Sequence, residues 1–204
     1  MITKNIENKN WKMSELVDKS LQAKSIKEYI AIIQSKAPDF YKVQRVNIYL
    51  CDHKRQEIYQ IVEHDSKSDK LIFFSSQSGI AGKVSNEGKS FIANNVEDYH
   101  QFLQKIDDPF GKYHPITGLP EGGWVNILTV PIFCYNSLME PCFQYYPLAV
   151  IQIINKLNEL PFTEDDQRNT ENWSQFLGKV LSFILRDDER KCIEEKKIML
   201  AEQE

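Results

Sequence analysis

The fold is decided by one stretch near the C-terminus, which reads Ile151-Gln152-Ile153-Ile154-Asn155-Lys156 and, after a short gap, Phe162-Thr163-Glu164-Asp165-Asp166. Its first part is among the most apolar segments of the chain, which predicts a strand at the centre of a sheet. Thr163 followed three residues later by Asp166 is a capping-box pattern, which predicts that a helix begins there. We therefore expect a strand, a connection and a helix, with an ion pair between Lys156 and Asp166 that clamps the connection over Phe162.

Outward from this stretch, alternating apolar residues and turn residues predict further elements. The expected strands are 43–51, 57–63, 71–74, 91–93, 127–134 and 147–154. The expected helices are two between Trp11 and Ala37, a short one after Gly79 that Gly88 ends, one over 97–106, and a long one from Thr163.

Two local signals set the boundaries of the second helix. Ser25 and Glu28 form a capping box at its start, and Pro38 is expected to end it. The element order predicts an α+β fold with a central antiparallel sheet of about six strands, flanked by helices, and a long C-terminal helix. The Pro- and Gly-rich stretch 107–123 is expected to be a functional or mobile loop.

Composition limits the classes of function. The 204 residues carry 25 basic and 29 acidic side chains, a net charge of −4, which argues against a dedicated nucleic-acid-binding protein. No apolar run approaches the roughly 20 residues that cross a bilayer, and the N-terminus lacks a secretory signal. Four scattered cysteines indicate reduced thiols, so a cytoplasmic location is expected.

The motifs of common catalytic sites are absent from the sequence. It contains no nucleophile elbow, no phosphate-binding glycine loop and no metalloprotease helix. The four histidines stand at spacings that suit no metal site. We therefore expect no catalytic residues, no metal ion and no enzymatic activity.

Several motifs, in order, resemble the GAF domain family, the regulatory modules of cyclic-nucleotide phosphodiesterases and many signalling proteins. The likeness spans roughly 14–185. It is carried by Val46–Asp52, Gly79–Gly82, Val96–Tyr99, Ile127–Ile132 and Ile151–Lys156. Phosphodiesterase-type members carry a signature of Asn, Lys, Phe, Asp and Glu. Here Asn155, Lys156, Phe162 and Asp166 match it, and Gln167 stands in the glutamate position.

The resemblance implies a ligand pocket that could hold cAMP or cGMP. The candidate pocket residues are Phe74, Ile80, Ala81, Tyr99, Trp124 and Asn126. The free N–H groups of a helix that begins at Gly79 could receive a cyclic phosphate. Ligand-binding members usually show Gly-aromatic-x-Thr before the strand that ends in Pro-Ile, and Asn126 ends the corresponding stretch Gly122–Asn126 without that threonine.

Two hypotheses of function follow. The first is a small-molecule sensor that binds a cyclic nucleotide. The second, which we favour, is a non-catalytic interaction module in a larger signalling or structural assembly. Under this hypothesis the chain consists of a polar arm (1–13), the GAF-like domain (14–185) and a charged helical extension (186–204). A protein partner or a second copy would bind the terminal helices and the aromatic insertion 136–146, whereas no nucleic acid or membrane is expected as a partner.

Overall fold

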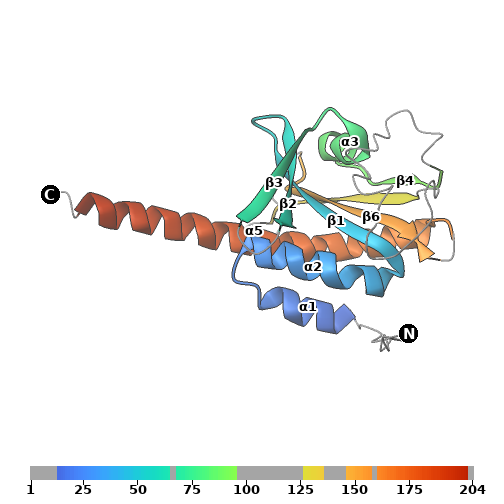
Figure 1. The fold of residues 1–204 in the computed structure, drawn as a ribbon, viewed down its shortest axis with the longest axis horizontal. Coiled ribbons are helices and arrows are strands. Elements are labelled where there is room, and N and C mark those ends of the chain that lie inside the picture. The colour runs from blue at the N-terminus through green and yellow to red at the C-terminus, as the bar shows by residue number, and fades with distance from the viewer. Residues whose placement is uncertain (1–12, 65–67, 96–125, 136–145, 158–159, 202–204) are drawn as a thin grey trace.

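A six-stranded antiparallel sheet forms the centre of the molecule, with strand order β3-β2-β1-β6-β5-β4 (Figure 1). The computed structural model describes residues 13–64, 68–95, 126–135, 146–157 and 160–201. The strands are β1 (Val43–Asp52), β2 (Glu57–His64), β3 (Ser68–Ser75), β4 (Phe91–Ala93), β5 (Ile127–Ile132) and β6 (Ala149–Lys156). The helices are α1 (Met13–Leu21), α2 (Ile26–Tyr41), α3 (Gly79–Glu87) and α5 (Glu164–Ala201).

The two faces of the sheet are covered by different helices. Helices α2 and α5 pack on one face and α1 packs on α2, whereas α3 lies on the opposite face (Figure 1). Successive side chains of a strand point to opposite faces, so register assigns each residue to the α5 side or the α3 side. Strands β1 and β6 pair at the centre of the sheet, and β5 lies on the other side of β6. Both central strands are buried through most of their length, as expected.

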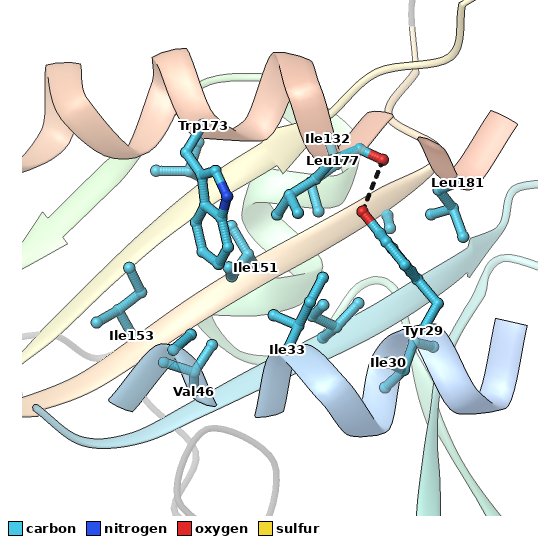
Figure 2. Close-up of a cluster of buried hydrophobic side chains, with 14 of the residues drawn as sticks. Tyr29, Ile30, Ile33, Val46, Ile132, Ile151, Ile153, Trp173, Leu177 and Leu181 are labelled. Atoms are coloured by element: carbon cyan, nitrogen blue, oxygen red, sulfur yellow. Dashed lines mark hydrogen bonds between the residues drawn. The ribbon is translucent and has the colours of Figure 1, made fainter. Parts of the chain in front are cut away.

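The main core lies between the sheet and the helices α2 and α5 (Figure 2). Tyr29 and Ile33 of α2 face Leu177 and Trp173 of α5 across the apolar side chains of β1 and β6. The Tyr29 hydroxyl donates a hydrogen bond of 3.1 Å to the Leu177 carbonyl, which satisfies a polar group inside this core. Helix α5 is thereby fixed to α2 as well as to the sheet.

The second helix runs further than the sequence predicted. Its start is as expected, because the Ser25 hydroxyl accepts a hydrogen bond from the Glu28 N–H. The prediction that Pro38 ends it was wrong, since α2 continues to Tyr41 and closes on the left-handed residue Lys42, whose N–H bonds to the Pro38 carbonyl. A proline in the last turn removes only one intrahelical hydrogen bond, so the helix can pass through it.

The strands, the short helix α3 and its glycine cap agree with the sequence-based expectation. Gly88 has a φ of 63° and its N–H bonds to the Val84 carbonyl, as a left-handed C-cap should. The predicted helix 97–106 and loop 107–123 lie outside the described residues. Helix α5 extends as one continuous helix well beyond the sheet toward the C-terminus (Figure 1). Within the described part of the chain, no helix is both long enough and apolar enough to cross a bilayer.

Candidate functional site

The connection from β6 to α5 is held by an ion pair. Lys156 Nζ lies 2.6 Å from an Asp166 carboxylate oxygen, and both side chains are about three-quarters buried. The same oxygen accepts hydrogen bonds from the Thr163 N–H and hydroxyl, at 2.8 and 2.9 Å. The Thr163 hydroxyl in turn accepts a bond from the Asp166 N–H, which completes the capping box. Phe162 is buried beneath this arrangement, and Lys156 Nζ lies 5.9 Å from its ring centroid.

The pKa of Asp166 lies below its ordinary value of 3.8. Burial acts in the opposite direction and raises the pKa, but the hydrogen bonds from Lys156 and Thr163 and the charge of Lys156 together outweigh it. A carboxylate with a lowered pKa stabilises the folded state above the unfolded pKa, and this stabilisation is lost as the pH falls through the folded value. The ion pair should therefore contribute at neutral pH, and its contribution should fall as the pH drops below about 4.

Asp166→Asn is expected to lower the free energy of unfolding at pH 7 and to lower it less at pH 3. The measurement is urea unfolding of both proteins at each pH. Asp165→Asn is the matched control, because Asp165 is exposed and contacts Arg168 on the outside of the helix. A loss of stability in Asp166→Asn that is the same size at both pH values would contradict the assigned role.

Asn126 lies directly before β5 and is completely buried. Its side-chain oxygen accepts a hydrogen bond of 2.9 Å from the Lys156 N–H, and its side-chain nitrogen donates one of 2.7 Å to the Leu160 carbonyl. Asn155 adopts a left-handed conformation with a φ of 57° and bonds through its side chain to the Asn126 N–H and to Gln44. Asn126, named from the sequence as part of a pocket wall, thus also links three strands and the connection that leads to α5.

The remaining sequence-derived pocket residues divide into two groups. Ile80 and Ala81 are fully buried on the α3 side, where Ala81 contacts a cluster that includes Tyr49 and Phe74. The Tyr49 and Phe74 rings meet edge to face, with centroids 6.1 Å apart. Tyr99 and Trp124 lie outside the described residues. The structure therefore brings Phe74 and Ala81 together on the face of the sheet that carries α3.

This face also contains a row of buried polar side chains, which we call the amide row. It consists of Asn47, Tyr49, Gln60, Thr129 and Gln152. The strand register places Gln152 between Asn47 and Thr129. The Tyr49 hydroxyl accepts a bond of 3.3 Å from Asn47 and donates one of 3.4 Å to Gln152. Gln60 donates one of 3.4 Å to Asn47.

Two polar atoms of the amide row have no hydrogen-bond partner among the described residues. They are the Thr129 hydroxyl oxygen and the Gln60 side-chain oxygen. Buried polar groups usually find a partner, and leaving one unsatisfied costs about 1–3 kcal/mol. The two atoms are therefore positioned to accept a hydrogen bond from a bound molecule or from another part of the chain.

The amide row was not singled out from the sequence, although a signal exists. Asn47, Thr129 and Gln152 each stand as a single polar residue within an otherwise apolar run. Such a residue inside a central strand must be buried, so a strand assignment alone would have marked all three.

Among the described groups, Cys51 is a poor candidate for a catalytic nucleophile. Cys51 accepts a hydrogen bond from Ser85, yet burial raises the pKa of its thiol to about 11. It is therefore protonated at neutral pH, which makes it a poor nucleophile. In the part of the chain that the structure describes, no group of three or more His, Cys, Asp or Glu side chains is placed to hold a metal ion.

The outer surface on the α5 side carries exposed apolar side chains. Leu21 of α1 and Phe183 of α5 are 61% and 60% exposed, and Leu71 and Phe73 of β3 are 46% and 50% exposed. The ring of Phe73 packs on that of Tyr59, which register and packing assign to the α5 side. Single exposed apolar side chains are common on protein surfaces, whereas a contiguous apolar patch often marks a contact surface.

Comparison with solved structures shows which fold these elements form. The GAF domain of a phosphoenolpyruvate-protein phosphotransferase from Acinetobacter matches with a TM-score of 0.62 and 15% identity, over 86% of this chain and 94% of that chain. The equivalent GAF domain from Coxiella burnetii matches with a TM-score of 0.58 and 13% identity, over 92% and 99%. Free methionine-R-sulfoxide reductase from Neisseria meningitidis matches with a TM-score of 0.58 and 12% identity, over 85% and 88%.

At these identities the likeness is one of fold, and it shows that this chain has the GAF fold. No protein-family model matches the chain. The similar structures include both regulatory domains and a reductase, so the fold is compatible with more than one kind of function.

Proposed function

We propose that this chain is a non-catalytic regulatory module that assembles with a helical protein partner, in the first instance a second copy of itself. The observation that supports this best is the length of α5. Ile184 and Leu185 are the last of its described side chains that pack in the core, and the helix continues to Ala201 beyond the sheet and the other helices (Figure 1).

An isolated helical segment is only marginally stable in water, because most helical stability comes from packing of one face. The part of α5 beyond Arg186 therefore calls for another helix beside it. A second copy can supply that helix through the same surface, as two-fold symmetric assemblies do. The exposed Phe183 lies directly before this segment and would be covered by such a contact.

Phe183→Glu is expected to convert the assembly to a single chain. A charge at the centre of an apolar contact is costly to bury, whereas the same residue at an exposed position of the monomer should leave the fold intact. Light scattering on the full chain would show twice the chain mass for the parent protein and one chain mass for the variant. Gln175→Glu, an exposed position on the same helix, adds the same charge and should leave the mass unchanged.

Two outcomes would contradict the proposal. One is a parent protein that remains a single chain at high micromolar concentration and co-purifies with no partner. The other is a Phe183→Glu variant that assembles as tightly as the parent.

A small-molecule sensor is the second candidate, and the amide row favours it. The row offers uncharged donors and acceptors, and the oxygens of Thr129 and Gln60 have no partner among the described residues. Arg45 precedes Asn47 by two positions on β1, so it shares this face and could supply a positive charge to a cyclic phosphate.

Titration of the full chain with cAMP and cGMP by calorimetry tests this second candidate. If a cyclic nucleotide bonds to the amide row, Thr129→Val should weaken binding on the order of tenfold, because it removes a hydroxyl and keeps the shape. Absence of heat at high micromolar ligand, with folded protein, would exclude the cyclic nucleotides.

A further inference from the structure

We propose that Asn94 and Asn126 are positioning residues that couple the neighbouring strands β4 and β5 to the start of helix α5. The inference rests on the proposed function, since α5 is the helix through which the module would assemble. Asn94 directly follows β4 and Asn126 directly precedes β5. The two strands pair with Ala93 opposite Ile127, so the two asparagines stand at the same end of the pair.

Both asparagines bind the same connection, the one from β6 to α5. The Asn94 side chain accepts a hydrogen bond of 2.7 Å from the Phe162 N–H and donates one of 3.0 Å to the Phe162 carbonyl. The Asn126 side chain donates to the Leu160 carbonyl and accepts from the Lys156 N–H. Only a primary amide offers a donor and an acceptor in this geometry, so aspartate would lose one bond and leucine would lose both.

The connection is in turn fixed to the helix. Phe162 is followed by Thr163, which caps α5 together with Asp166, and Asp166 pairs with Lys156 at the end of β6. The contacts thus form a closed ring that runs from β4 through the connection to α5, and back through β6 to β5. A displacement of β4 and β5 that keeps these hydrogen bonds would therefore move the first turn of α5 as well.

The ring gives the module a route from one face of the sheet to the other. Thr129 of the amide row lies on β5, three positions after Asn126. Anything that bonds to the amide row and shifts β5 would therefore alter the position of α5 on the opposite side. Asn94 and Asn126 transmit the shift and do not themselves contact what causes it.

The first test is a double-mutant cycle on the full chain, with Asn94→Ala, Asp166→Asn and the double variant. Among the described contacts, no hydrogen bond joins Asn94 to Asp166, so independent residues would give unfolding constants that multiply. If the ring acts as one unit, the unfolding constant of the double variant should be at least threefold smaller than the product of the two single effects predicts. If the unfolding constant of the double variant lies within a factor of two of that product, the coupling would be overturned.

The second test separates positioning from general destabilisation. Amide hydrogen exchange in the start of α5, residues 164–172, should rise at least tenfold in Asn94→Ala and Asn126→Ala, while exchange in α2 changes much less. Asn94→Asp keeps the acceptor for Phe162 and should restore part of the protection. Val84→Ala, a buried control in α3 outside the ring, should not raise exchange in α5 selectively.

An equal rise in exchange in α5 and α2 would overturn the proposal, because it would show a purely structural role. Neither test depends on assembly. A chain that is coupled in this way but stays monomeric would refute the proposed function alone, and an assembling chain without coupling would refute only the positioning role.

Discussion

Trp173→Ala is expected to lower the free energy of unfolding by about 3–5 kcal/mol, the range for removing a large aromatic side chain from a core. Trp173 is 4% exposed and lies in the cluster between the sheet and the helices α2 and α5 (Figure 2). Its ring centroid is 5.3 Å from that of Tyr41 at the end of α2. The substitution therefore opens a cavity at the point where the two helices meet on the sheet.

Thermal unfolding provides the measurement, since each kcal/mol shifts the Tm of a chain of this size by about 2–4 °C. Trp173→Phe is the matched control. The indole N–H has no hydrogen-bond partner among the described residues, so phenylalanine loses volume without leaving a partner unsatisfied. Trp173→Phe should lose clearly less stability than Trp173→Ala, and equal losses in the two variants would contradict the packing role.

Gly178→Ala is expected to destabilise the fold by about 2–3 kcal/mol, although alanine normally stabilises a helix interior by about 1 kcal/mol relative to glycine. A Cβ at this position would lie 2.3 Å from the Phe133 carbonyl oxygen and 3.0 Å from the Tyr135 ring. The obstacle is backbone, so relief requires α5 to move away from the segment after β5. Ser182 and Arg186 hold that segment, since the Ser182 hydroxyl accepts a bond from the Tyr135 N–H and Arg186 donates to its carbonyl.

The sign of the effect makes this substitution a sharp test of how closely α5 approaches the sheet. Asn172→Ala, at an exposed position of the same helix, should be neutral or slightly stabilising, as helix propensity alone predicts. Urea unfolding of both variants gives the comparison. A Gly178→Ala protein as stable as Asn172→Ala would show that the close contact does not exist in solution.

Much of the fold could be predicted from local signals. The Thr163 and Ser25 caps, the Gly88 stop, the strand composition of β1 and the alternation in β2 each depend on residues within one turn or one strand, and each of these elements is confirmed. Pro38 shows where local reasoning fails. Its effect depends on how near it stands to the helix end, which the sequence around it does not reveal.

The site was less accessible from the sequence, because it depends on register and on long-range contacts. Asn47, Thr129 and Gln152 become neighbours only when three strands pair in one register. Asn94 joins Phe162 across 68 positions of sequence, and no local pattern distinguishes it from any other asparagine after a strand. Lys156 and Asp166 were named in advance because they flank a single strand-to-helix connection.

In the proposed role, the two faces of the sheet have different tasks. One face of the sheet presents the amide row, and the other face carries α5. The connection from β6 to α5 is bonded to Asn126, directly before β5, which contributes side chains to both faces. Burial of Cys51 raises its thiol pKa and makes it a poor nucleophile. What the geometry offers is a buried polar surface, a rigid connection and a long helix that leaves the body of the domain.

A native mass spectrum of the full chain tests the central claim most directly, because it shows partners and small ligands in one measurement. The account predicts a complex of two chains, or of one chain with a protein partner, that falls apart in Phe183→Glu and persists in Gln175→Glu. A single chain that carries a bound small molecule, with no protein partner at any concentration, would contradict it and favour the sensor instead.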